Sequence, residues 1–253
     1  DGDTGLPHQL NFYNDFVRSN KERTVVIISD AMRYEVGRSL FEKLQADAKC
    51  TTSISAMQSV LPSYTKFGMA ALLPHNTIEV LPDSRTLADG KPTDDIKQRE
   101  AVLQAANPDS RCVKYDDIKS MNVSALRDVF TGQNVVYVYH DQIDARGDHA
   151  STENEVFNAC EEAVEEIYFL VRKLTSSANT IHYIITADHG FIYKRDKLSE
   201  SDKISGIPDA DRRYALTDRD VQGEGVASLP FSSIIGADDS RRVYFPVSYT
   251  HLT

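Results

Sequence analysis

An apolar run that ends in an aspartate, residues 24–30 (Thr-Val-Val-Ile-Ile-Ser-Asp), constrains the fold of this chain more than any other stretch. Four β-branched apolar residues follow one another without polar alternation, which is typical of a strand buried on both faces in a parallel sheet between helices. Ligands bind at the carboxyl ends of the strands in such sheets, so Asp30 is a candidate functional residue. The run therefore predicts an α/β fold.

Two further segments have the same form. Residues 180–190 end in Asp188-His189-Gly190, and residues 135–144 (Val-Val-Tyr-Val-Tyr-His-Asp-Gln-Ile-Asp) end in Asp144. Because the carboxyl ends of parallel strands meet at one edge of a sheet, the three segments predict a metal site assembled from distant parts of the chain. An adjacent carboxylate and imidazole suit Zn²⁺ or Mn²⁺. A helix cap beside a surface histidine is the alternative for Asp188-His189.

The segment after the 135–144 run offers more than one set of ligands. Asp144, Asp148 and His149 fall within six residues, which makes them candidate metal ligands. The alternative is a polar loop that caps the next helix. His140 and Asp141 compete for the same role, although they lie closer to the body of the strand.

Composition excludes several classes of protein. No apolar run approaches the roughly 18 residues that a membrane span needs, and three widely spaced cysteines suit a reducing, cytoplasmic compartment. A net charge of −10 argues against a passive nucleic-acid binder, which would normally show a basic face. It does not exclude an enzyme that acts on phosphates, because two bound divalent cations would reverse the sign of the charge locally.

The remaining elements follow from hydrophobic periodicity and from Pro and Gly positions. Residues 48–55 are expected to be extended, 83–97 to form a surface loop, and 198–241 to hold no firm elements. The sequence predicts helices at 10–20, 34–44, 62–73, 95–106, 123–130 and 152–174, and strands at 24–29, 134–139, 180–187 and 242–245.

Thr65 is the candidate nucleophile. Pro62 suits the first turn of a helix that Pro74 would end, so Thr65 is expected near a helix N-terminus, where N–H groups and the helix dipole favour a phosphate. A threonine hydroxyl needs a nearby metal ion to become reactive, and without one Thr65 would be an ordinary first-turn residue. Ser63 is its rival. Lys66 and Arg33 are candidate phosphate-binding residues, although single cations are usually solvated.

Together these segments resemble the alkaline phosphatase superfamily. Asp30-Ala-Met-Arg33 is similar to its first metal-ligand segment, Pro62-Ser-Tyr-Thr65 to a Pro-x-x-Thr nucleophile turn, and Asp188-His189-Gly190 to its Asp-His-Gly segment. Within the superfamily the chain resembles most the PglZ domain of bacterial BREX and Pgl phage-defence systems. The stretches that carry this resemblance are residues 28–35 (Ile-Ser-Asp-Ala-Met-Arg-Tyr-Glu), 139–144 (Tyr-His-Asp-Gln-Ile-Asp) and 185–191 (Ile-Thr-Ala-Asp-His-Gly-Phe).

The resemblance implies a three-layer α/β/α sandwich around a mainly parallel sheet, with up to two divalent ions, zinc or manganese. One ion would be held by Asp30, Thr65, Asp188 and His189, and the other by Asp144 with Asp148 or His149. The family expects a late His followed by glycines, but the only later histidine here is His251. We expect residues 1–22 to be a lead-in helix and linker. Because the late His-Gly segment is missing, we expect residues 23–253 to be an alkaline phosphatase-like domain from a larger protein, truncated at its C-terminus.

The function implied is a metal-dependent phosphoester hydrolase. A threonine nucleophile, with no evident arginine clamp for a terminal phosphate, favours diesters, including nucleotides or nucleic acid. The expected partners are other phage-defence proteins and no membrane. The alternatives are a non-catalytic scaffold subunit with a vestigial metal site, and a phosphomutase, which would need a substrate-clamping insertion.

Overall fold

The structure is a computed structural model that describes residues 4–147, 155–191, 203–204, 214–221, 225–246 and 251–252. The chain folds into two compact units. The first contains residues 1–59 and 65–191, and the second contains Val60–Tyr64 and residues 192–253. Each unit is described separately.

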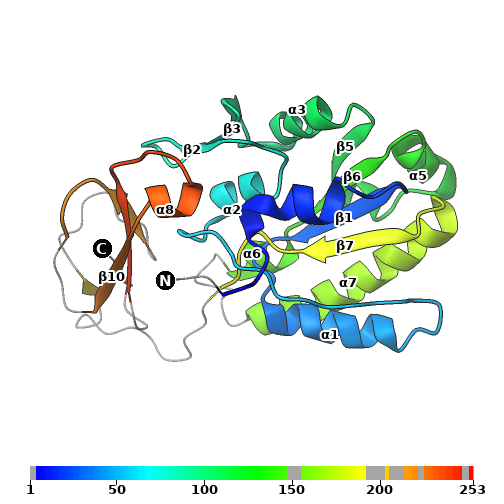
Figure 1. The fold of residues 1–253 in the computed structure, drawn as a ribbon. Helices are drawn as coiled ribbons and strands as arrows, with labels where there is room; N and C mark the ends of the chain where they lie inside the picture. The colour runs from blue at the N-terminus through cyan, green and yellow to red at the C-terminus, as the bar shows by residue number, and fades with distance from the viewer. Residues whose placement is uncertain are drawn as a thin grey trace. The chain divides into compact units, whose positions relative to one another are not determined.

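A parallel sheet forms the centre of the first unit, with the strand order β5-β6-β1-β7 (Figure 1). The strands are β1 (Thr24–Ser29), β5 (Ser110–Lys114), β6 (Val135–His140) and β7 (His182–Thr186). Thr24 of β1 pairs with Val135 on one side and with His182 on the other, so the carboxyl ends of all three strands lie at the same edge. The predicted α/β fold with a mainly parallel sheet is confirmed.

Helices flank this sheet (Figure 1). The face with α1 (Tyr34–Gln45) and α7 (Val156–Ser177) is opposite the face with η1 (Gln9–Asn11), η2 (Tyr13–Val17), α2 (Thr65–Ala71) and α3 (Ile96–Ala106). The short α4 (Tyr115–Ile118) and α6 (Gln142–Gly147) follow β5 and β6, and α5 (Val123–Phe130) leads into β6. No helix in the described part of the chain has the length and apolarity needed to cross a bilayer.

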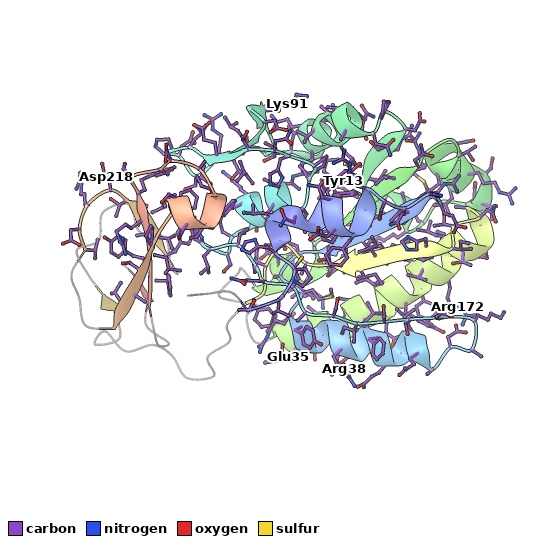
Figure 2. The ribbon with its side chains drawn as sticks, viewed as in Figure 1. Tyr13, Glu35, Arg38, Lys91, Arg172 and Asp218 are labelled. Atoms are coloured by element: carbon purple, nitrogen blue, oxygen red, sulfur yellow. The ribbon has the colours of Figure 1, made fainter. Side chains whose placement is uncertain are left out.

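The apolar run of β1 is buried along its whole length, as its composition predicted. Successive side chains of a strand point to opposite faces, so Val26 and Ile28 share one face of the sheet. They pack in a buried cluster with Phe12, Tyr13, Met69, Leu72, Leu103 and Tyr137. Side chains fill the space between this face and its helices, and Tyr13 of η2 is one of them (Figure 2).

Two parts of the first unit differ from what the sequence predicted. Residues 83–97 are not a loop: β3 (Thr86–Ala88) and β4 (Lys91–Pro92) form a hairpin, with β2 (Ile78–Val80) on the other side of β3. Asp89 and Gly90 both have positive φ, which is the geometry of a two-residue hairpin turn. β5 was not predicted, because its polar sequence Ser-Arg-Cys-Val-Lys fits an edge strand and lacks an apolar run.

The helix predicted from residue 62 begins instead at Thr65. Val60–Tyr64 belong to the second unit, where Tyr64 stacks on Tyr214 at 5.1 Å between ring centroids, and the helix starts only after them. The helices predicted at 95–106 and 123–130 are confirmed, the first with Asp95 as its N-cap. Thr152, the predicted start of the long helix, lies outside the described residues, and α7 begins at Val156.

The second unit contains an antiparallel sheet in a stretch where the sequence predicted no firm elements before residue 242. β9 (Ala215–Thr217), β10 (Val226–Pro230) and β11 (Arg242–Pro246) have the order β10-β11-β9, and α8 (Ser232–Ile235) follows β10. Ala215 and Tyr244 form its small buried cluster. β8 (Lys203–Ile204) pairs with β12 (His251–Leu252) in a two-residue parallel ladder.

Candidate metal centre

The carboxyl edge of the central sheet brings together side chains that are far apart in sequence. Asp30 follows β1, Asp144 lies in α6 after β6, and His189 follows β7. One ligand atom from each of these three residues lies within 4.8 Å of the other two. This is the juxtaposition that the three strand-like segments predicted.

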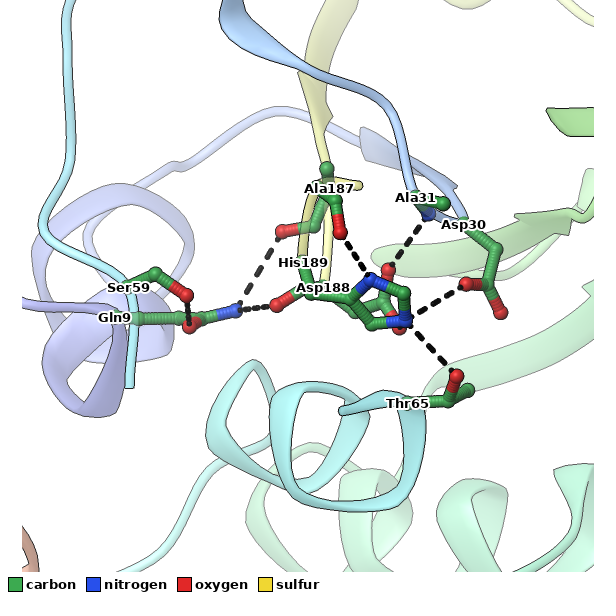
Figure 3. A network of polar contacts seen from close by, with 9 residues as sticks. Gln9, Asp30, Ala31, Ser59, Thr65, Ala187, Asp188 and His189 are labelled. Carbon is green, nitrogen blue, oxygen red and sulfur yellow. Dashed lines mark hydrogen bonds and ion pairs between the residues drawn. The ribbon is translucent and has the colours of Figure 1, made fainter. Parts of the chain in front are cut away.

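The imidazole of His189 lies next to the side chains of Thr65, Asp30 and Asp188 (Figure 3). Its Nε2 lies 3.0 Å from Thr65 Oγ1, 3.4 Å from Asp30 Oδ1 and 3.5 Å from Asp188 Oδ2. Its Nδ1 lies 2.8 Å from the carbonyl oxygen of Gly190. A carbonyl only accepts, so Nδ1 carries the proton in this pairing. The lone pair of a neutral His189 is then on Nε2, facing the carboxylates, as is usual for a metal-binding histidine.

Two buried carboxylates each have one oxygen near this lone pair that lacks a hydrogen-bond donor. Asp30 Oδ1 and Asp188 Oδ2 are buried and have no hydrogen-bond partner among the described residues. Burial, and then the neighbouring carboxylates of Asp188 and Asp144, raise the pKa of Asp30. Burial also raises the pKa of Asp188, against backbone N–H groups that lower it. Buried acceptors of this kind need a cation or protons, so the residues present fit a divalent metal ion.

Asp188 is fixed in place by the backbone around it. The N–H of Ala31 donates to Asp188 Oδ1 at 3.2 Å. Ala31 has φ 62°, a left-handed conformation that costs a non-glycine residue about 1–2 kcal/mol. The strained turn after Asp30 therefore directs an N–H group at the carboxylate of the neighbouring strand end.

Gln9 supports the same strand end from outside the cluster (Figure 3). Its buried Nε2 donates to the carbonyl oxygen of Asp188 at 2.7 Å, and its Oε1 accepts from Ser59 Oγ at 3.0 Å. Gln9 thus connects the N-terminal 3₁₀ turn, the segment that precedes Thr65 and the strand end that carries His189. The sequence analysis missed it, because a glutamine that binds a carbonyl 179 positions away leaves no local pattern.

Gly68 was also missed, although a signal for it existed. α2 comes so close to the backbone of Asp188 at this residue that no side chain fits there. An isolated glycine inside a helical pattern is less stable than alanine there, so it points to a packing or functional reason. Tyr137 Oη donates to the carbonyl of Leu72 at 2.7 Å, which holds the other end of the same segment against β6.

His140, one rival of Asp144, has its hydrogen-bond partners outside the cluster. His140 is buried, with Nδ1 3.1 Å from Ser29 Oγ and Nε2 3.0 Å from Glu166 Oε2. Burial lowers the pKa of His140, although Glu166 opposes this. Asp141 is exposed. Asp148 and His149, the further candidates in this segment, lie outside the described residues.

The two candidate phosphate-binding cations differ in their surroundings. Arg33 forms an ion pair with Glu35, and its guanidinium carbon lies 5.2 Å from the centroid of the Phe191 ring. Lys66 is exposed at the start of α2. Ser63, the rival of Thr65, belongs to the second unit.

Three other histidines of the first unit have partners outside the cluster. His8 caps η1, His75 Nδ1 lies 2.8 Å from the carbonyl of Leu73, and His182 Nδ1 lies 3.1 Å from Thr24 Oγ1. The side chain of His251 lies outside the described part of the structure.

Comparison with known proteins identifies relatives of the chain. The profile of a family described as "BREX system PglZ alkaline phosphatase-like domain" matches residues 11–252. "Alkaline phosphatase-like protein PglZ" of Bacillus cereus (strain H3081.97) is 39% identical over 249 residues, which are 96% of this chain and 29% of that protein. "Alkaline phosphatase-like protein BrxZ" of Escherichia coli O9:H4 (strain HS) is 38% identical over 206 residues, which are 79% of this chain and 24% of that protein. The chain therefore spans less than a third of the length of either relative.

Proposed function

Since this chain belongs to the PglZ family of alkaline phosphatase-like domains, as its sequence motifs indicated, we propose that it carries the site of a metal-dependent phosphoester hydrolase. The observation that carries this proposal is the position of Thr65. Its hydroxyl lies 3.0 Å from Nε2 of His189, beside a cluster of buried and half-buried acidic groups suited to a divalent cation. A hydroxyl at the border of such a cluster is the arrangement that nucleophilic attack on phosphorus needs.

Asp30, Asp144, Asp188 and His189 would hold the metal, zinc or manganese. A bound divalent cation supplies Lewis-acid polarisation of a phosphoryl oxygen and lowers the pKa of a nearby hydroxyl. A second ion would need further ligands, for which Asp148 and His149 remain the candidates from the sequence.

The protein groups have separate tasks in this proposal. Thr65 Oγ1 would form a bond to phosphorus while the bond from phosphorus to the leaving group breaks on the opposite side. Water would then hydrolyse the phosphothreonine and regenerate the hydroxyl. The Nδ1–H bond to Gly190 keeps the His189 ring oriented, and the Ala31 N–H keeps the Asp188 carboxylate oriented.

We propose phosphodiesters, including nucleotides or nucleic acid, as the substrate class. A terminal phosphate dianion is usually bound by a free arginine fork. Here Arg33 pairs with Glu35 and lies over the Phe191 ring, and Lys66 is exposed. These surroundings support neither residue as a clamp for a terminal phosphate. The longer protein would act in a cytoplasmic BREX-type phage-defence system, together with other defence proteins.

Hydrolysis by the longer protein tests this proposal. Purified protein is assayed with bis-aryl diesters and aryl monoesters in the presence of Zn²⁺ or Mn²⁺, beside Asp30→Ala and Asp188→Ala variants whose folding is checked by circular dichroism. We expect metal-dependent cleavage that both variants lose while they remain folded. If the intact protein cleaves neither ester class with any divalent metal, the alternative of a non-catalytic scaffold subunit replaces the hydrolase.

A further inference from the structure

Two large aromatic residues are exposed where helices begin at the carboxyl edge of the central sheet. Tyr34 is the first residue of α1 and is 54% exposed, and Phe157 is the second residue of α7 and is 49% exposed. Ligands of parallel α/β sheets bind at this edge. Aromatic rings that face water there are therefore placed to contact a ligand.

Tyr34 is positioned beside the metal centre through the residue before it. Arg33 lies against the strand end that carries His189, because a Cβ atom at Gly190 would be 3.5 Å from Arg33 Cγ and 3.9 Å from Arg33 Cα. Asp30 precedes Tyr34 by one short turn of the chain. α1 therefore begins next to two of the strand ends that supply the candidate metal ligands.

Phe157 is positioned beside the same centre through a different contact. Its neighbour Val156 is buried against the end of α6, since a Cβ atom at Gly147 would be 3.4 Å from Val156 Cγ2. α6 carries Asp144, the third member of the candidate metal cluster. α7 therefore begins next to the remaining ligand segment.

The starts of α1 and α7 lie side by side (Figure 1). Lys43 of α1 pairs with Glu165 at 2.5 Å, and Tyr168 Oη donates to Asp47 at 3.1 Å. These partners are 122 and 121 positions apart, so the two helices run in the same direction. Phe157 precedes Tyr168 by about three helical turns and shares its α1-facing stripe. The two exposed rings thus belong to one surface.

The surroundings of the rings fit the flat face of a nucleobase better than an apolar partner. Protein and lipid partners need a continuous apolar patch. Here the residue one turn further along each helix is charged and exposed or half-buried, Arg38 in α1 and Glu161 in α7 (Figure 2). A base needs only one or two rings, because its π-face stacks on an aromatic side chain whatever the base is.

We propose that Tyr34 and Phe157 form a stacking site for the nucleobase of a nucleoside phosphodiester whose phosphate lies at the metal centre. This rests on the proposed hydrolase and narrows its substrate class from phosphodiesters in general. Stacking strengthens the binding of a base by about 5- to 100-fold. The net charge of −10 does not oppose it, because stacking needs no cationic surface. A duplex would not bind, since its bases are already stacked and paired.

Two aryl diesters that differ only in their second substituent test the site in the full-length protein with Zn²⁺. We expect a KM for thymidine 5′-p-nitrophenyl phosphate about 5- to 100-fold below that for methyl p-nitrophenyl phosphate. Tyr34→Ala and Phe157→Ala should remove most of this difference and leave the kinetics of the methyl diester unchanged. Tyr34→Phe and Phe157→Tyr keep a ring and should keep the difference. Phe169→Ala, at a 60% exposed ring on another face of α7, is the matched control.

Binding without turnover separates the stacking site from the hydrolase. Fluorescence of 2-aminopurine riboside 5′-monophosphate should be quenched by the Zn²⁺-loaded wild type and by Phe169→Ala. The affinity should fall about fivefold or more in Tyr34→Ala and Phe157→Ala. Competition by oligothymidylate, compared with thymidine monophosphate, then shows whether the base belongs to a nucleic-acid strand or to a free nucleotide.

The outcomes distinguish the two proposals. Ring-dependent binding without cleavage of either diester would contradict the hydrolase and support the stacking site. Equal KM values for the two diesters, equal affinity in the alanine variants and the wild type, or no quenching at all would each overturn the stacking site.

Discussion

Gly68 of α2 lies against the main chain of Asp188 so closely that a Cβ atom at residue 68 would be 2.4 Å from the Asp188 carbonyl oxygen. The same oxygen accepts a hydrogen bond from the Gln9 side chain. A methyl group at residue 68 would meet the main chain and the Cβ atom of Asp188. It could be accommodated only if α2 or the strand end that carries Asp188 moved. Thr65 lies one helical turn before Gly68, and the contact therefore sets its distance from His189.

Gly68→Ala should lower both stability and metal affinity. Overpacking of this kind typically costs about 1–3 kcal/mol, and the shift of α2 should also separate Thr65 from His189. Thermal unfolding and calorimetric Mn²⁺ titration measure the two effects. Gly37→Ala in α1 is the matched control, because a Cβ there meets nothing within 4 Å. It should keep metal affinity and gain up to about 1 kcal/mol of stability. If Gly68→Ala keeps the stability and metal affinity of the wild type, α2 moves away from Asp188 at little cost and the prediction is wrong.

Gln9→Met should weaken metal binding without unfolding the protein. The change keeps the length and most of the volume of the side chain but removes the amide that holds the Asp188 carbonyl, and loss of such outer support typically costs 10- to 100-fold in metal affinity. Gln104→Met removes a similar bond, from Gln104 Nε2 to the carbonyl of Ser110, and should leave metal affinity unchanged. Equal affinities in the two variants would mean that Gln9 serves stability alone.

Metal binding should become tighter as pH rises. Burial keeps the Asp30 and Asp188 carboxyls protonated above the usual carboxyl range near pH 4 when no metal is present. The unfolded chain releases these protons more easily, so the metal-free protein loses stability from this pair as pH rises above about 4. A divalent ion displaces the protons, and its stabilising effect therefore grows with pH.

The measurement is the rise in Tm on adding Mn²⁺ or Zn²⁺, compared at pH 5.5 and pH 8, with a chelator-treated sample as reference. We expect a larger rise at pH 8, and a much smaller one for Asp30→Asn at both values. A rise that is independent of pH would mean that the ion binds away from these carboxyls.

Substitutions at Thr65 separate attack by the side chain from attack by a metal-bound water. Thr65→Ala removes the hydroxyl but leaves Asp30, Asp144, Asp188 and His189, so the longer protein should still bind metal while turnover falls by orders of magnitude. Thr65→Ser keeps a hydroxyl and should retain part of the activity. Ser63→Ala should have little effect. Loss of activity in Ser63→Ala but not in Thr65→Ala would move the nucleophile to Ser63, and full activity in both would exclude a covalent intermediate on either residue.

The parts of the site predicted from sequence are those that strand topology dictates. Asp30, Asp144 and His189 each follow a buried apolar run, and parallel strands bring their carboxyl ends together whatever the intervening chain does. The long helices were predicted for a similar reason, since periodic apolar residues need a core to face.

The missed parts depend on polar or single-residue contacts. β5 is an edge strand of largely polar residues, and the β3–β4 hairpin is marked only by Asp89-Gly90. The bond from Gln9 to a main-chain carbonyl is set by tertiary packing that no local pattern records. The approach of Gly68 to Asp188 is marked in the sequence only by an isolated glycine within a helical pattern. The position of Ala31 in the left-handed region is another such case, because nothing about an alanine indicates positive φ.

The distance in sequence between the segments of the metal centre also bears on synthesis of the protein. The N–H of Ala31 and the carboxylate that it binds, Asp188, are 157 positions apart. At translation speeds of about 5–20 residues per second, roughly 8 to 31 seconds pass between the synthesis of Ala31 and that of Asp188. During that time β1, which is fully buried in the folded protein, lacks β7, one of its two neighbours in the sheet. Binding of the proposed metal ion would therefore require that residue 189 has left the ribosome.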